Sequence, residues 1–163
     1  MDRVAALLAK QKEILSYAQS PLLLLIRLYW GWQFIQTGSG KLEHIDKVAA
    51  WFGNDLHIPM PRLNAYMAGG TELVGGIALL LGLRVMTIPL LFTMAVAYAT
   101  SDREALNALF TDPDQFVTAT PFLFLFAALL VLVFGPGAFS LDELVGRYGK
   151  GKPAGAGAKN RKR

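Results

Sequence analysis

Apolar residues gather in four blocks along the chain, separated by short polar stretches. The blocks cover residues 21–38, 62–84, 85–100 and 116–134. The second is long enough to cross a bilayer as a helix, which takes about 20 residues. The fourth carries no charge, whereas the first is interrupted by Arg27 and the second by Glu72. The pattern predicts an all-α fold, an integral membrane four-helix bundle.

Two further helices are predicted outside the blocks. Apolar residues recur at helical spacing over residues 1–20, which predicts an amphipathic helix on the membrane surface or, alternatively, packed on a partner. Pro21 suits the first turn of a new helix, the first span. The loop over residues 39–62 repeats the amphipathic pattern beside Trp51, which predicts an interfacial helix in the first external loop.

The connections between the blocks are marked by glycine. Gly38 and Gly40 are predicted to end the first span, and the run from Gly135 to Gly137 to end the fourth. Residues 82–84 leave almost no room for a loop, so the second and third spans should form a tight antiparallel hairpin. Residues 101–115 are predicted to be a polar loop.

The candidate site is the pair of charges inside the blocks, Arg27 and Glu72. A charge near the middle of a span costs roughly 2.5–3.5 kcal/mol, so such a residue should face protein or water instead of lipid. Both residues lie on glycine-lined faces, and counting inward from Pro21 and Leu83 places their backbones about 7 Å apart in height. We therefore predict that they meet, with Lys41 as the next candidate partner for Glu72.

Two interpretations of this pair remain open. It is either a buried structural ion pair or a ligand, proton or quinone site. Trp30 and Phe34 share the face of Arg27, and with Lys41 they are candidate lining residues for such a ligand.

Composition agrees with a membrane protein. Hydrophobic residues make up 53% of the chain and charged residues only 17%, against about 25% in a usual soluble domain. The absence of cysteine excludes disulfides and thiol chemistry within the chain. His44 and His57 have no recognised zinc spacing, so no metal site is predicted.

The distribution of basic residues predicts the orientation. With four spans, eleven Lys and Arg fall on the side of the two termini and four on the other, which places both termini in the cytoplasm. Residues 143–163 are predicted to form a basic, disordered cytoplasmic tail. Its charge is better explained by topology and attraction to anionic lipids than by nucleic-acid binding.

Several motifs together resemble the DoxX family. They are Gly31-x-x-Phe34-x-x-x-Gly38-x-x-Lys41-Leu42, Glu72-Leu73-Val74-Gly75-Gly76, Leu79-Leu80-Leu81-Gly82-Leu83-Arg84 and Gly135-Pro136-Gly137-Ala138-Phe139-Ser140-Leu141-Asp142. The resemblance covers residues 21–142 and implies a four-helix domain in the bacterial cytoplasmic (inner) membrane. Some relatives are subunits of thiosulfate:quinone oxidoreductase, related to its DoxD subunit, and others associate with oxidative-stress systems.

Three functions are compatible with these features. The first is a membrane subunit of a redox or oxidative-stress complex, with a quinone near Arg27, Trp30 and Glu72. The second is a non-catalytic membrane anchor or assembly scaffold for partner proteins, and the third a small transporter, which would need several copies. The chain has no haem motif, cluster ligands or nucleotide loop, so it is at most a non-autonomous part of an enzyme. Membrane lipids and protein partners are expected, and a homo-oligomer is left open.

Overall fold

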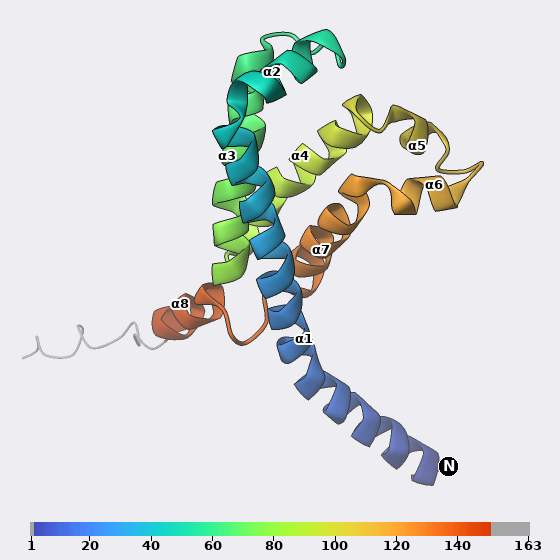
Figure 1. Ribbon diagram of the computed structural model, residues 1–163. Coiled ribbons are helices and arrows are strands. Elements are labelled where there is room, and N and C mark those ends of the chain that lie inside the picture. Colours follow the sequence, from blue (N-terminus) through green and yellow to red (C-terminus); the bar gives the residue numbers. More distant parts are fainter. Residues whose placement is uncertain (1, 151–163) are drawn as a thin grey trace, which may run out of the picture.

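A computed structural model of the chain describes residues 2–150; residue 1 and residues 151–163 lie outside the described part. All regular elements in the described part are helices (Figure 1), which confirms the all-α prediction there. In chain order they are α1 (Asp2–Glu43), α2 (Ile45–Asn54), α3 (Pro61–Leu81), the 3₁₀ turn η1 (Arg84–Met86), α4 (Thr87–Thr100), α5 (Arg103–Asn107), α6 (Pro113–Thr118), α7 (Thr120–Phe134) and α8 (Leu141–Lys150).

Helices α1 and α3 run side by side in opposite directions (Figure 1), and their backbones touch at glycine. A Cβ atom added to Gly38 would lie 2.4 Å from the amide nitrogen of Leu73, and one added to Gly76 would lie 2.8 Å from the carbonyl oxygen of Gly31. The glycines on each helix recur after two turns, so they share one face. Small residues on such a face let two helices approach closely.

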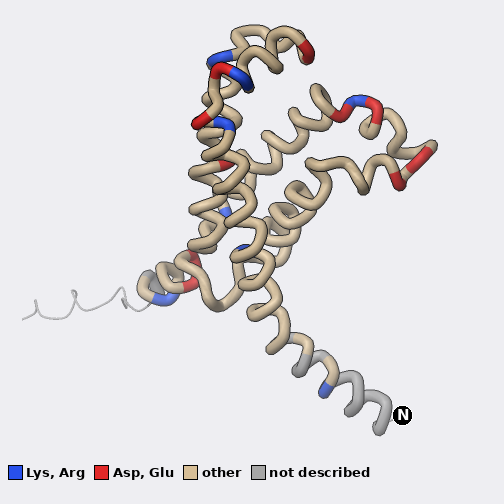
Figure 2. The backbone as a smooth tube through the Cα atoms, viewed as in Figure 1, with Lys and Arg blue, Asp and Glu red and all other residues tan. Residues whose placement is uncertain are grey.

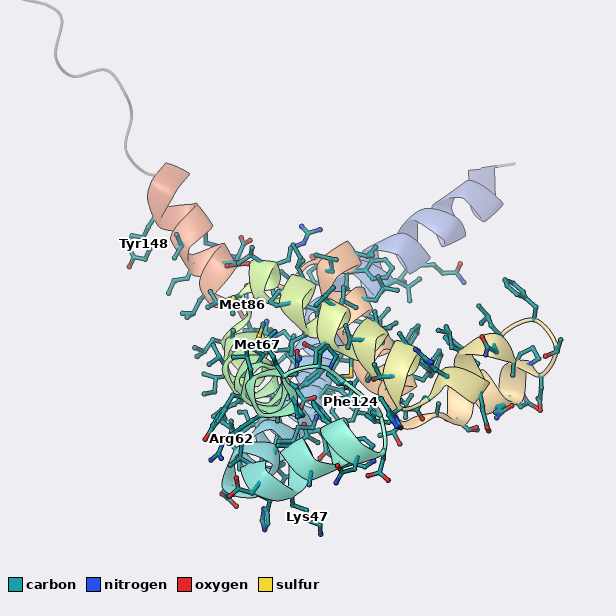
Figure 3. All side chains as sticks on the ribbon, turned by 90° about the horizontal axis from the view of Figure 1, so that it is seen from above. Lys47, Arg62, Met67, Met86, Phe124 and Tyr148 are labelled. Atoms are coloured by element: carbon teal, nitrogen blue, oxygen red, sulfur yellow. The ribbon has the colours of Figure 1, made fainter. Side chains whose placement is uncertain are left out.

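Helices α4 and α7 form a second pair that leans away from α1 and α3 (Figure 1). The core lies where the four helices meet, and Figure 3 shows Phe124 of α7 among the side chains there. Its buried members are Phe34, Leu79, Leu90, Met94, Ala128 and Val131. Each long helix thus contributes an apolar face to one shared core.

The connection from α3 to α4 confirms the predicted short turn. Gly82 has φ +78°, a left-handed conformation that costs little only for glycine. The amide of Leu83 donates to the carbonyl of Ala78 at 2.9 Å, and that of Gly82 to the carbonyl of Leu79 at 3.1 Å. This is a Schellman ending, which satisfies the last carbonyls of the helix. Only η1 follows before α4 turns back.

Helix α1 is continuous where the sequence predicted two boundaries. It runs through Pro21 and on through Gly38 and Gly40 to Glu43, so neither a separate helix over residues 1–20 nor an ending at the glycines is correct. Proline leaves the carbonyl of Tyr17 without its helical donor, but Tyr17 is exposed. Glycine costs only about 1 kcal/mol in a helix. Contact of Gly38 with α3 compensates for that cost.

The second half of the chain contains more helices than predicted. The predicted loop over 101–115 contains α5, and the predicted block over 116–134 is divided at the extended residue Ala119 into α6 and α7. Residues 143–150 belong to α8, so the prediction of a disordered tail is wrong for them. The rest of that tail, residues 151–163, lies outside the described residues. Helix α2 confirms the helix predicted within residues 39–62.

No helix in the described part of the chain is both long and apolar enough to cross a membrane. The four predicted spans are therefore not confirmed, although the predicted helices over them are present. Charged residues gather around α2, around α5 and α6, and on α8 (Figure 2), whereas α4 and α7 carry none within their bounds.

Candidate functional site

Glu72 lies on the face of α3 that packs against α1. Its position between Gly69 and Gly76 places it beside the closest approach of the two helices, and the residue is 2% exposed. A carboxylate buried in this way needs a partner, because an isolated buried charge is strongly disfavoured.

The partner of Glu72 is Lys41. The Lys41 ammonium donates to Glu72 Oε1 and forms an ion pair with it. The lysine side chain is 30% exposed, so the pair is reachable from the α2 end of α1. The second oxygen, Oε2, is buried without a hydrogen-bond partner among the described atoms.

Arg27 is buried at the opposite end of the α1–α3 contact, 1% exposed. Its guanidinium donates to the carbonyl of Pro136, to that of Phe139 at 2.7 Å and to that of Leu80 at 3.2 Å. One side chain of α1 therefore binds the C-terminal end of α3 and the loop after α7. The negative end of the α3 dipole also favours a cation at this place.

The predicted pairing of Arg27 with Glu72 is wrong. The glycine contacts set a register in which Arg27 lies opposite Leu80, eight residues or about 12 Å from Glu72 along α3. Side chains also lean toward the N-terminus of their own helix. In antiparallel helices this lean carries Arg27 and Glu72 apart and brings Lys41 and Glu72 together. Counting from Pro21 misplaced the register, because α1 does not begin there.

Trp30 and Phe34 are packed into the core. Phe34 is fully buried and meets Phe124 edge to face, with ring centroids 4.7 Å apart. Trp30 meets the same ring at 5.0 Å. Such aromatic pairs stabilise a core beyond the area they bury. The ring of Phe124 therefore occupies the position in which a ligand ring would have to stack on Trp30 and Phe34.

A cavity of about 430 Å³ lies elsewhere, between the end of α4 with α5 and the α6–α7 junction. Its lining is Ser101, Asp102, Arg103, Glu104, Ala105, Gln115, Thr118 and Ala119. None of the five candidate residues lines it. Among the described residues, no group of three or more His, Cys, Asp or Glu could hold a metal ion.

One continuous segment, about half of the chain, identifies its family. A family model described as DoxX matches residues 22–103. The chain belongs to the DoxX family. The match includes Arg27, Lys41 and Glu72 but ends before Pro136 and Phe139, which bind Arg27.

The other comparisons add no relative. No curated protein and no solved structure matches the chain. DoxX proteins are generally membrane-associated, and membership therefore supports a membrane location for this chain.

Proposed function

We propose that this DoxX-family chain is a membrane-embedded, non-catalytic subunit of a redox or oxidative-stress complex, for which it provides a scaffold. The observation that carries the proposal is that both buried charges are bound within the chain. Arg27 binds three carbonyl groups and Glu72 binds Lys41. Buried charges that are bound within the chain hold its helices together. The sequence also contains no group that could carry electrons.

Large apolar side chains on the outside of the bundle support a lipid or protein environment. Trp32 of α1, Val74 of α3, Phe92 of α4 and Val133 of α7 are each more than half exposed. Large exposed apolar side chains on every long helix are typical of surfaces that contact lipid or another protein. A bilayer or partner subunits would cover these faces.

A second candidate function is contact with a quinone or quinol at Lys41 and Glu72. The unpartnered Glu72 Oε2 favours it, because a carboxylate oxygen can accept a bond from a quinol hydroxyl. The partly exposed Lys41 could donate to a quinone carbonyl. Stacking of a quinone ring between Trp30 and Phe34 is disfavoured, because both side chains already pack on Phe124. Any quinone site in this chain would therefore centre on the ion pair.

Glu72→Gln tests the two candidates. The amide keeps the shape of the carboxylate but cannot hold or relay a proton. Tagged wild type and variant are purified in mild detergent with their partners, and quinone-linked activity of the assembly is measured. Under the scaffold proposal, assembly and activity are both retained. Loss of activity from an intact assembly overturns it in favour of quinone contact.

A quinone-dependent thermal shift gives an independent readout. It is measured on the purified chain with a soluble quinone, alongside Glu43→Gln, which changes an exposed acid near Lys41. A shift present in wild type and Glu43→Gln but lost in Glu72→Gln supports the second candidate. The scaffold proposal predicts no shift in any of the three proteins.

A further inference from the structure

Helix α8 carries an apolar stripe that the described chain leaves increasingly exposed toward the end of the helix. The stripe consists of Leu141, Leu144, Val145 and Tyr148, spaced three, four and seven residues apart, which places them on one helix face. Their exposure increases along the helix, from 38% to 50%, 68% and 79%. The opposite face carries Glu143 and Arg147, which form an ion pair at 3.1 Å.

The first turn of α8 is fixed to the bundle. Asp142 Oδ2 accepts a bond from the amide of Arg84 at 2.7 Å, whereas Ser140 Oγ caps α8 itself by accepting one from the amide of Glu143 at 3.2 Å. Arg27 holds the preceding carbonyl of Phe139. Beyond this anchor α8 runs outward, crosswise to α3 (Figure 1), and Tyr148 points away from the other helices (Figure 3).

We propose that α8 lies in the membrane–water interface on the side of the α3–α4 turn, with its apolar stripe among the acyl chains. The inference rests on the proposed membrane location of the chain. A helix crosswise to α1 and α3 lies in the plane of a bilayer that those helices enter. A strong apolar face opposed by a charged one is typical of such interfacial helices.

The basic residues near α8 favour anionic lipid as the partner of its apolar stripe. From residue 144 to the end of the chain there are seven Lys and Arg and no acid. Basic segments beside a membrane are attracted to anionic headgroups, each Lys or Arg adding to the affinity near the surface. The four apolar side chains of the stripe thus match the acyl chains of an anionic leaflet, and the basic segment matches its headgroups.

Spin labels on single cysteines test the proposal in the full chain. Because the chain has no cysteine, each variant carries one thiol. Val145→Cys and Tyr148→Cys report on the stripe, and Glu143→Cys and Arg147→Cys are the matched polar positions. Each protein is reconstituted in nanodiscs containing phosphatidylglycerol or phosphatidylcholine alone. Collision with oxygen, which dissolves in lipid, is compared with collision with an aqueous nickel complex.

We expect the two stripe positions to favour oxygen and the two polar positions to favour nickel in the anionic discs. The difference should shrink in phosphatidylcholine and at high salt. Equal nickel access at all four positions overturns the proposal. Protection of the stripe from both reagents also overturns the proposal, because the stripe is then covered by protein. Label–label distances between chains show whether that protein is a second copy of this chain or a partner.

Failure of the inference is distinguishable from failure of the proposed function. Carbonate extraction reports whether the chain is embedded in the membrane. An embedded chain with an aqueous stripe overturns only the placement of α8. An extractable chain overturns the embedded location, while the collision pattern still reports whether α8 binds the surface.

Discussion

Arg27 and Lys41, the two cations of the α1–α3 contact, have different kinds of partner. Arg27 is surrounded by neutral carbonyl groups, whereas Lys41 faces a carboxylate. A planar guanidinium can donate in several directions at once, and an ammonium is a compact point charge. Arg27 therefore joins three chain segments, and Lys41 joins two helices.

Removing Lys41 should cost more stability than neutralising Glu72. Lys41→Met leaves a buried carboxylate without compensation, and we expect a loss of about 3 kcal/mol, the low end for a broken buried pair. Glu72→Gln should cost about 1 kcal/mol, because the partly exposed Lys41 can turn to water. Denaturant titration in detergent measures both. The double variant should lose less than the sum, and Lys47→Met, at an exposed position, should be neutral. Equal losses for the two single variants would contradict this ordering.

Arg27→Lys should destabilise the chain although the charge is kept. The ammonium cannot reproduce the fork that reaches Leu80, Pro136 and Phe139, and a bond to a charged group contributes about 1.5–3 kcal/mol. We expect a loss of about 2 kcal/mol in the same titration. Arg62→Lys, on an exposed side chain, should change stability by less than about 0.5 kcal/mol. A wild-type midpoint for Arg27→Lys would show that shape is unimportant there.

At this scale the sequence predicts which charges are buried but not what they bind. Arg27 and Glu72 stand out because their neighbours in the chain are apolar. Their partners depend on the register of α1 against α3 and on side-chain lean, which a count from predicted helix ends misjudges. The carbonyl acceptors at Pro136 and Phe139 are main-chain atoms, and no residue type marks them.

At the scale of elements, the α1–α3 contact is the most demanding. This contact requires glycine only where the two backbones meet. Some other glycines of the two helices could be replaced without a clash. A Cβ atom on Gly40 or Gly70 would meet nothing within 4 Å, in contrast to Gly38.

Alanine substitutions separate these two classes of glycine. Gly38→Ala should force the helices apart and cost about 1–3 kcal/mol, as overpacking does. Gly70→Ala should stabilise α3 by up to about 1 kcal/mol, because alanine favours the helix. Melting temperatures in one detergent compare the two. Stabilisation by both would contradict the close approach.

Element prediction succeeds where the sequence gives both a period and a stop. Helix α3 begins and ends close to the predicted bounds because Pro61 and Gly82 mark them. Helix α1 was divided wrongly, since proline and glycine usually end helices but here lie within one. Helix α8 was missed because its apolar spacing precedes a basic tail whose composition suggested disorder.

At the scale of the whole molecule, charge asymmetry predicts the orientation. With eleven Lys and Arg against four, we expect the termini and the α3–α4 turn on the cytoplasmic side, and α2 with α5 and α6 outside. A reporter fused after Arg163 should be active as a cytoplasmic fusion, and one inserted near Asp112 as an external one. The reverse pattern would invert the bundle and move α8 to the outer leaflet.

The contacts of Arg27 have a consequence for the synthesis of the chain. Its acceptors lie 53, 109 and 112 residues farther along the sequence. While the ribosome is still making α7, the carbonyl groups of Pro136 and Phe139 are not yet available as acceptors for the guanidinium of Arg27. The guanidinium then favours a hydrated position. We expect the first helix to reach its final depth only when translation is almost finished. A nascent chain interrupted before residue 136 would thus display an unsatisfied arginine to the quality-control proteases of the cell.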